Sequence, residues 1–384
     1  MNEPQTATED ISDAIPQSAT GVLTIDLAAI CENYRRLHQA GGMRGAAAMV
    51  KADAYGLGAK EVAPALARCG ARSFFVSTLD EGLALRPCLD AAVPACSIYV
   101  LNGPMEGCEA LYQEQKLLPV LNSLGQLETW RRYNKARDQV LPAALHLDTG
   151  MSRLGFPPQE LEKLAEYQDL LAGTLPVLVM SHLVSSEEAD NPLNPRQLEA
   201  FKAAIARLPK APASLANSSG IFLGEDYHFD LVRPGAALFG INPTPGKTNP
   251  MAQVASLKGK ILQVRWIDAP QSVGYGATYK VKRPARIATV AAGYADGAFR
   301  SLSNRGKAWA AGREVPVVGR LSMDLLTIDI TELHPDALSP GDFVELICAE
   351  HDVDALAQEA GTIGYEILTG LGRRYHRIYC GGNG

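Results

Sequence analysis

Lys51 is the first residue whose type and position could support chemistry. It ends an apolar run in the segment AAAMVKADAYGLG, and Tyr55 and a glycine-rich turn follow it. Apolar surroundings disfavour the charged ammonium form and so lower the pKa of a lysine. An amine that is unprotonated near neutral pH can form a Schiff base with an aldehyde. On its own, the segment fits an ordinary lysine between a strand and a helix at least as well.

Two further segments place polar groups after apolar runs. Arg233 ends such a run in DLVRPGAALFG, and the backbone amides of Gly235 and Ala236 could approach a phosphate. Asn217 and Ser218 lie in ASLANSSG and add amide and hydroxyl groups. In many (β/α)₈ barrels the loops after the seventh and eighth strands bind phosphate. The two segments therefore support each other as a phosphate site.

Three more residues are candidates only in combination with others. Arg153 follows an apolar run in LHLDTGMSRLGF, and His182 ends a very apolar run in VMSHLVS. A single histidine in such a place is more often a core residue with satisfied hydrogen bonds. Tyr275 lies between glycines in SVGYGATY. Because a tyrosine has an ordinary pKa near 10, it needs nearby positive charge to act as a base.

These side chains need a scaffold that brings the ends of several strands together. From Gly21 onward, apolar runs recur roughly every 20 to 35 residues, which is the length of one strand–helix unit. Patterns such as LDEGLALRPCLDAA, PQELEKLAEYQDLLAG and NPRQLEAFKAAIARL predict helices between them. The predicted strands end near Val50, Val76, Val100, Val120, Leu147, Met180, Leu215 and Val232. This pattern predicts an α/β fold, a (β/α)₈ TIM-type barrel with its active site at the carboxyl ends of the strands.

The sequence changes character after residue 252. Short β-rich runs between Gly, Pro and Asp turns replace the long helical patterns until DVDALAQEAGTIGYEILTGL. Such runs are typical of a compact, mostly antiparallel domain. We therefore expect a disordered tail at 1–20, the barrel at 21–252 and a β-rich C-terminal domain at 253–384.

Composition excludes several classes of protein. The chain of 384 residues has 36 Lys and Arg against 42 Asp and Glu, a net charge of −6, which argues against nucleic acid or an anionic membrane as partner. No apolar run approaches the roughly 18 residues of a membrane helix. The seven cysteines contain no Cys-x-x-Cys pair, so they indicate neither a disulfide framework nor a metal site. With an N-terminus unlike a signal peptide, we expect a cytoplasmic protein with reduced cysteines.

Seven motifs follow one another in a fixed order along the chain: VKADAYGLG, DTGMSRLG, ANSSG, VRPGAALFG, GYGATY, GYADG and VGRLSMD. Together they closely resemble the alanine racemase family, the pyridoxal-phosphate barrel racemases of fold type III. The resemblance covers nearly the whole chain after the N-terminal tail. It implies interconversion of L-alanine and D-alanine by two bases, supplying D-alanine for peptidoglycan if the source is bacterial.

The resemblance also implies a role for each central residue. Lys51 is expected to carry pyridoxal 5'-phosphate covalently and to act as the base on the D-alanine face. Tyr275 is expected to be the base on the L-alanine face, donated by the partner subunit of a homodimer with shared active sites. Arg233 is similar to the arginine that hydrogen-bonds the pyridine nitrogen, which a guanidinium leaves unprotonated. His182 is similar to the histidine beside the cofactor ring.

The other matches are contacts to cofactor and substrate. Arg153 is expected to contact the phenolic oxygen of the cofactor and the substrate carboxylate. The partner subunit's Met323 is expected to bind that carboxylate through its backbone amide, and Tyr294 to line the entrance. The residues similar to phosphate ligands or pocket positions are Tyr55, Leu101, Asn217, Ser218, Gly235 and Ala236.

Three positions depart from the family pattern. His146 stands where many relatives carry a carbamylated lysine, so we predict no carbamate here and expect a bound anion or water to orient Arg153. Ser214 stands where the family often has a histidine, so the support behind Arg233 is expected to differ. Arg373 falls where some relatives have a tyrosine that reaches the phosphate, which makes Arg373 a candidate phosphate ligand.

Two alternatives remain open from the sequence. A broader amino-acid racemase, acting on serine or other small amino acids, would carry the same motifs, because pocket width cannot be read from them. A pyridoxal-phosphate carrier without catalysis is less favoured. Single-domain barrel relatives of that kind lack the second domain, so the presence of Tyr275 and Met323 counts against it.

Overall fold

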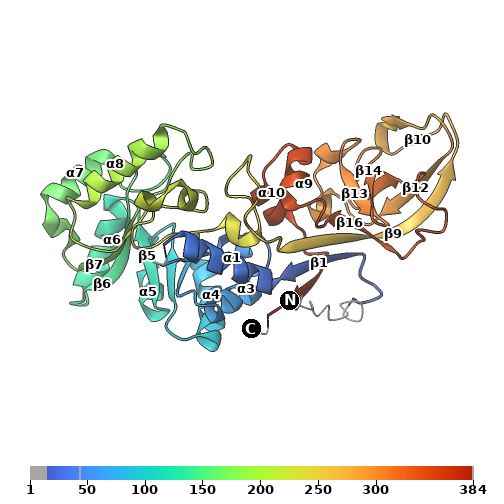
Figure 1. Ribbon diagram of the computed structural model, residues 1–384. Coiled ribbons are helices and arrows are strands. Elements are labelled where there is room, and N and C mark those ends of the chain that lie inside the picture. Colours follow the sequence, from blue (N-terminus) through green and yellow to red (C-terminus); the bar gives the residue numbers. More distant parts are fainter. Residues whose placement is uncertain (1–14, 43–44, 383–384) are drawn as a thin grey trace, which may run out of the picture. The chain divides into compact units, whose positions relative to one another are not determined.

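The computed structural model describes residues 15–42 and 45–382 (Figure 1). The chain divides into two compact units. Among the described residues, the barrel unit comprises those between Leu27 and Ala252 together with 381–382, and the strand-rich unit comprises 15–26 together with Gln253–Cys380. The change of sequence character after residue 252 predicted two domains of this kind.

Within the described residues, the barrel unit contains a parallel sheet of seven strands in sequential order. They are β2 (Ala48–Met49), β3 (Ser73–Val76), β4 (Ser97–Val100), β5 (Leu117–Leu121), β6 (Leu141–His146), β7 (Thr174–Met180) and β8 (Ala213–Ser214). Val232 fills the eighth position through a parallel bridge to Ala46. On the other side, the N–H of Arg233 donates to the carbonyl of Ala216 at 2.9 Å.

The barrel therefore closes, and the predicted fold class is confirmed. The eighth predicted strand, ending near Val232, is reduced to a bridge. Pro234 follows it immediately and has no N–H to donate to a ladder, which limits how far pairing can continue.

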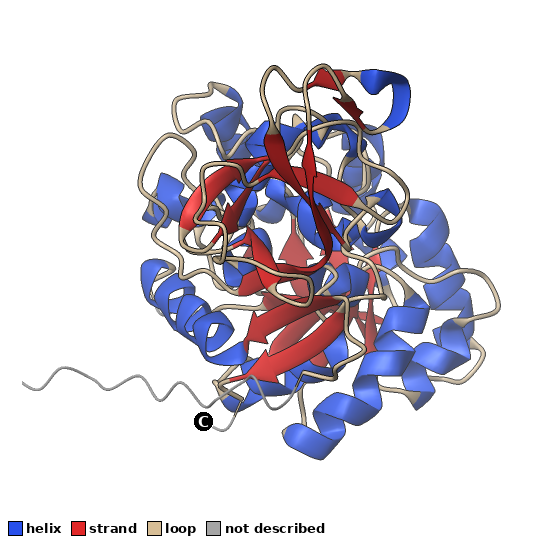
Figure 2. Ribbon diagram, turned by 90° about the vertical axis from the view of Figure 1, so that its right-hand side faces the viewer, coloured by secondary structure: helices blue, strands red, loops and turns tan. Residues whose placement is uncertain are grey.

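Helices separate the parallel strands and lie around them (Figure 2). They are α1 (Leu27–Ala40), α3 (Ala59–Arg68), α4 (Leu79–Ala92), α5 (Glu109–Glu114), α6 (Leu124–Lys135), α7 (Pro158–Glu166) and α8 (Leu193–Ile205). Capping explains where α4 and α6 begin. Thr78 and Glu81 form a capping box at α4, and Ser123 accepts a hydrogen bond from the N–H of Gln126 at α6. The three helical patterns read from the sequence are confirmed as α4, α7 and α8.

The strand-rich unit is built on the long strand β9 (Ala255–Ile267). Its other strands are β1 (Gly21–Asp26), β10 (Ser272–Val273), β11 (Tyr279–Lys280), β12 (Ala285–Val290), β13 (Lys307–Ala310), β14 (Arg313–Pro316), β15 (Leu326–Asp329), β16 (Phe343–Ile347) and β17 (His376–Cys380). β9 pairs antiparallel with β1, β12 and β16, and β1 pairs in parallel with β17. Two helices, α9 (Val353–Ala360) and α10 (Gly364–Gly370), complete the unit.

The N-terminal segment belongs to this sheet. Residues 21–26, which the sequence analysis placed at the start of the barrel, form β1 between β9 and β17. The tail predicted at 1–20 lies outside the described residues as far as residue 14. Beyond it, the carbonyls of Gln17 and Thr20 accept hydrogen bonds from Lys260 of β9.

Cys31 of α1 and Cys69, which ends α3, form a disulfide with their Cα atoms 5.9 Å apart. The expectation of reduced cysteines is therefore wrong for this pair. A spacing of 38 residues carries no motif, and only the packing of the two helices brings the thiols together. Among the described residues, no helix is long and apolar enough to cross a membrane, and no cluster of His, Cys, Asp and Glu could hold a metal ion.

Candidate active site

Lys51 lies two residues after β2, at the start of the short turn α2 (Lys51–Tyr55). The four residues after it have left-handed backbone angles, with φ between 53° and 56°, although none is a glycine. Such angles cost about 1–2 kcal/mol per residue. Two carboxylates support the turn: Glu81 accepts from the N–H of Ala52 at 2.6 Å, and Asp53 accepts from the N–H of Ala59 at 2.8 Å. The strained turn is thus fixed from both sides.

The amine of Lys51 has the electrostatic environment that the sequence predicted. Burial lowers its pKa, the positive charge of Arg153 lowers it further, and Glu81 partly opposes the shift. In the described part of the chain the amine makes no hydrogen bond. Lys51 is therefore more easily deprotonated than a surface lysine, as nucleophilic and base catalysis require.

Hydroxyl and amide groups meet beside Tyr55. The Ser218 hydroxyl oxygen accepts from the N–H groups of Gly235 at 2.9 Å and Ala237 at 3.3 Å. A Cβ on Gly235 would lie 2.3 Å from the Tyr55 hydroxyl, so any larger residue there would displace the Tyr55 side chain. The loop of Ser218 is held by Asn217, whose side-chain oxygen accepts from the N–H of Gly220 at 2.8 Å. These donors are the groups that bind phosphate in proteins.

Arg233 is almost completely buried, with 3% of its surface exposed. Its guanidinium donates to the Ser214 hydroxyl and to the carbonyls of Ser181 and Leu215. Ser214 in turn donates to the carbonyl of Leu231. Burial lowers the pKa of Arg233 to about 9, which leaves the guanidinium charged at neutral pH. Ser214 therefore connects the guanidinium of Arg233 to the backbone at Leu231.

His146 ends β6 and is held in one tautomer. Its Nδ1 lies 2.8 Å from the side-chain oxygen of Asn122. The Asn122 amide nitrogen donates to the carbonyls of Leu101 and Val120, each at 2.9 Å, so its oxygen must accept from His146. Burial and then the charge of Arg233 lower the pKa of His146 to about 4. At neutral pH the imidazole is uncharged and keeps a lone pair on Nε2.

Arg153 acts electrostatically on three titratable side chains of the barrel unit. Its charge lowers the pKa values of Lys51, His146 and His182. For His182 the pKa falls well below the ordinary value, with burial first and Arg233 second among the causes. Asp148 shapes the loop, accepting from three successive backbone N–H groups between residues 150 and 152. Arg153 itself is exposed and makes no hydrogen bond to the described residues.

The remaining candidates lie in the strand-rich unit. Tyr275 is 70% exposed, on a turn between two glycines with φ of 76° and 70°. Tyr294 and Met323 lie on adjacent loops, because the N–H of Ala295 donates to the carbonyl of Met323 at 2.9 Å. Arg373 is exposed and makes no hydrogen bond within the described residues, so its contact with the phosphate stays a prediction.

Sequence reasoning missed two supporting residues of the barrel unit. Asn122 follows the apolar run LLPVL, the same signal that identified Lys51, and could have been found in that way. Glu81 stands three residues after Thr78, which predicts a capping box but not its second contact to the turn after Lys51. That contact depends on how α4 packs against α2, which no local sequence pattern predicts.

The residues of the barrel unit fit pyridoxal phosphate. Lys51 offers an amine with a lowered pKa for the aldehyde, and Arg233 offers a buried guanidinium for the ring nitrogen. The hydroxyls of Tyr55 and Ser218 suit the phosphate, and the absence of a side chain on Gly235, whose N–H holds Ser218, leaves room for its close approach. The fold and this set of groups define a barrel enzyme that uses a lysine and a phosphate-bearing aldehyde cofactor.

Comparison with known proteins names the family. The alanine racemase N-terminal domain matches residues 25–243, and the alanine racemase C-terminal domain matches residues 254–379. The alanine racemase of Rhodospirillum rubrum is 51% identical over 366 residues, covering 94% of this chain and 96% of the relative. That of Acidiphilium cryptum is 52% identical over 358 residues, covering 93% and 98%. The chain belongs to the alanine racemase family.

A solved structure agrees with this assignment. The crystal structure of alanine racemase from Bartonella henselae with covalently bound pyridoxal phosphate has 41% sequence identity and a TM-score of 0.89. The alignment covers 94% of this chain and 99% of that one. The resemblance read from the seven motifs is confirmed.

Proposed function

We propose that the protein interconverts L-alanine and D-alanine with pyridoxal phosphate held covalently on Lys51. The observation that carries the proposal is the lysine with a lowered pKa on a strained turn, in the same unit as the buried Arg233 and the loops of Ser218 and Gly235. Membership of the alanine racemase family supports the reaction and the cofactor. In a bacterial cell the product would supply D-alanine for peptidoglycan in the cytoplasm.

The reaction requires a proton to leave one face of the substrate α-carbon and another to arrive on the opposite face. When bound, pyridoxal phosphate withdraws electrons from the α-carbon and makes its proton acidic enough to remove. Lys51 Nζ holds or accepts the proton on the D-alanine face. The phenol of Tyr275 does the same on the L-alanine face.

Charged groups of the barrel unit orient the reactants. Arg153 binds the substrate carboxylate, and its positive charge adds to burial in lowering the pKa values of Lys51 and His182. Arg233 retains its proton and so gives none to the ring nitrogen of the cofactor. His146 is neutral and cannot replace the negative charge of a carbamate. We therefore expect no carbamate in this protein, with an anion or water beside Arg153.

The exposed residues of the strand-rich unit support a homodimer with shared sites. Tyr275 is 70% and Met323 54% exposed, high values for residues that must work in a shielded site. A second copy that contributes Tyr275 and the backbone amide of Met323 to the site would cover both. In this arrangement the twofold symmetry of a dimer completes two identical sites.

The assignment is tested by supplying purified protein and pyridoxal phosphate with L- or D-alanine and measuring the other enantiomer. We expect interconversion in both directions, with alanine faster than serine or lysine at equal concentration. Faster turnover of serine would favour the broader racemase. Absence of racemisation with bound cofactor would favour the carrier.

A further inference from the structure

Arg374 joins two loops of the strand-rich unit. Its Nε and Nη2 donate to the two carboxylate oxygens of Asp296, at 2.5 and 2.8 Å. Its Nη1 donates to Oδ1 of Asp324 at 2.7 Å. Asp296 lies two residues after Tyr294, and Asp324 directly follows Met323. We call Asp296, Asp324 and Arg374 the Arg374 bridge. Its bonds are charge-assisted, and those to Asp296 are bidentate, the strong and directional kind.

The two loops also touch through their backbones. The N–H of Tyr294 donates to the carbonyl of Ser322 at 3.1 Å, and the N–H of Ala295 to that of Met323 at 2.9 Å. A Cβ on Gly293 would overlap the Met323 carbonyl, so the loops approach as closely as glycine allows. The N–H of Met323, in contrast, has no acceptor among the described residues. This amide is available to a ligand.

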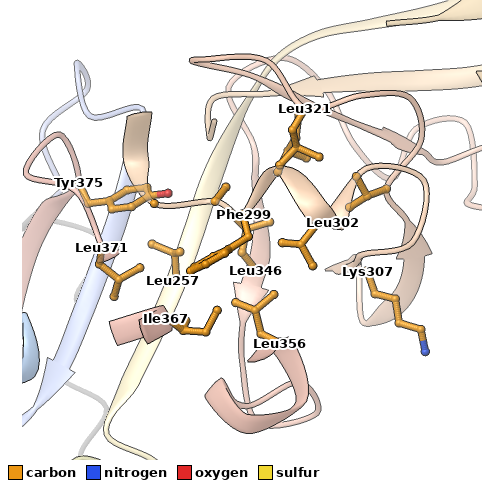
Figure 3. A pocket seen from close by; sticks show the side chains of 14 residues that line it. Leu257, Phe299, Leu302, Lys307, Leu321, Leu346, Leu356, Ile367, Leu371 and Tyr375 are labelled. Atoms are coloured by element: carbon orange, nitrogen blue, oxygen red, sulfur yellow. The ribbon is translucent and has the colours of Figure 1, made fainter. Parts of the chain in front are cut away.

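The base of the bridge is rigid. Leu371 and Tyr375, on either side of Arg374, are 7% and 5% exposed and line an apolar cavity of this unit (Figure 3). The N–H of Gly372 donates to the carbonyl of Asp296 at 2.9 Å. Asp296 is itself buried, and its Oδ2 also accepts from the N–H of Gly293 at 3.0 Å. Arg374 therefore starts from a fixed backbone and reaches the buried carboxylate of Asp296 and the exposed carboxylate of Asp324.

We propose that Arg374 is a positioning residue: through Asp296 and Asp324 it fixes the Met323 amide, expected at the substrate carboxylate, and Tyr294, expected at the entrance. The inference rests on the proposed function, since it needs Met323 to face the substrate. The pair of Arg374 with Asp324 is exposed on both sides, 52% and 55%, and exposed ion pairs add little to stability. A contribution to folding stability therefore does not explain this pair, whereas positioning of the two loops does.

The first test is amide hydrogen exchange of the holoenzyme. In Arg374→Gln and Asp324→Asn, we expect the N–H groups of Tyr294 and Ala295 to exchange about 10-fold faster or more, because the bridge no longer holds the loops closed. Arg283→Gln is the matched control, since Arg283 also pairs with a carboxylate, Glu332, on the surface of the same unit. Unchanged exchange in both bridge variants would overturn the proposal.

The second test separates positioning from structure. For Arg374→Lys and Asp324→Asn we expect kcat/KM for alanine to fall about 10- to 100-fold, mainly through KM. Binding of propionate, titrated against the holoenzyme, should weaken in parallel. The affinity for pyridoxal phosphate should not change, because Lys51, Ser218 and Arg233 lie in the barrel unit and the candidate phosphate ligand Arg373 keeps its side chain.

Faster exchange with unchanged KM and propionate affinity would overturn the positioning role. Equal loss of propionate and cofactor binding would do the same, by showing a general loss of structure. A wild type that binds propionate but racemises nothing would contradict the proposed function, and the exchange and propionate measurements would still decide the role of the bridge.

Discussion

In the barrel unit, Arg233 is 3% exposed and donates to three protein acceptors, whereas Tyr275 in the strand-rich unit is 70% exposed on a glycine turn. The first set of residues is completed within its own unit, and burial sets its charges. The second set lies on exposed tight loops, and its side chains are not covered within their own unit. This difference supports the proposal that the barrel unit binds the cofactor and that the strand-rich unit of a second subunit completes the substrate side of the site.

The largest expected effect comes from separating the two halves into different chains. Lys51→Ala and Tyr275→Phe should each reduce racemisation by about 1000-fold or more, because each removes one of two required bases. Unfolding and refolding an equal mixture should restore about one quarter of the wild-type activity, since half the dimers are mixed and each has one intact site. An inactive mixture would contradict shared sites.

Gly235→Ala tests the cofactor half. The new Cβ would overlap the Tyr55 hydroxyl, which must move away from the loop. We expect the affinity for pyridoxal phosphate to fall about 10-fold, the value of one good polar contact. Gly125→Ala is the control, because a Cβ there meets only Ser123, at 3.7 Å. Equal affinities in the two variants would remove Tyr55 and Gly235 from the phosphate site.

His146 gives the smallest effect and tests whether burial sets the charges of the barrel unit. The folded pKa of about 4 lies below the ordinary 6.5, so the unfolded chain binds more protons between these values. Stability from this group is present above pH 6.5 and is lost as pH falls toward 4. Between pH 7 and pH 5, wild type should lose about 2 kcal/mol more than His146→Gln in urea unfolding. Parallel losses would mean that His146 is not held neutral.

Much of the fold could be predicted because its signals are local. Apolar runs and helical spacing located the strands and helices of the barrel, and Thr78 with Glu81 marks where α4 begins. The pairing of β1 could not be predicted, because the sequence pattern of a strand does not determine which other strands it pairs with. The Cys31–Cys69 disulfide likewise depends on two helices meeting, which cysteine spacing does not reveal.

The candidate site divides in the same way. Lys51, Ser218 and Arg233 were found because polar residues at the ends of apolar runs stand out in a barrel. The left-handed turn after Lys51 could not be predicted, because none of its four residues is a glycine. Arg374 was missed because its partners lie 50 and 78 residues away, and a surface arginine is ordinary until the loops are folded together.

The central claim is that an amine and a phenol work on opposite faces of one carbon. Its most direct test is exchange of the α-hydrogen of each alanine enantiomer in deuterated water. Tyr275→Phe should still exchange D-alanine and lose exchange of L-alanine, while Lys51→Ala should show the reverse preference. Equal loss of exchange for both enantiomers in each variant would contradict the account.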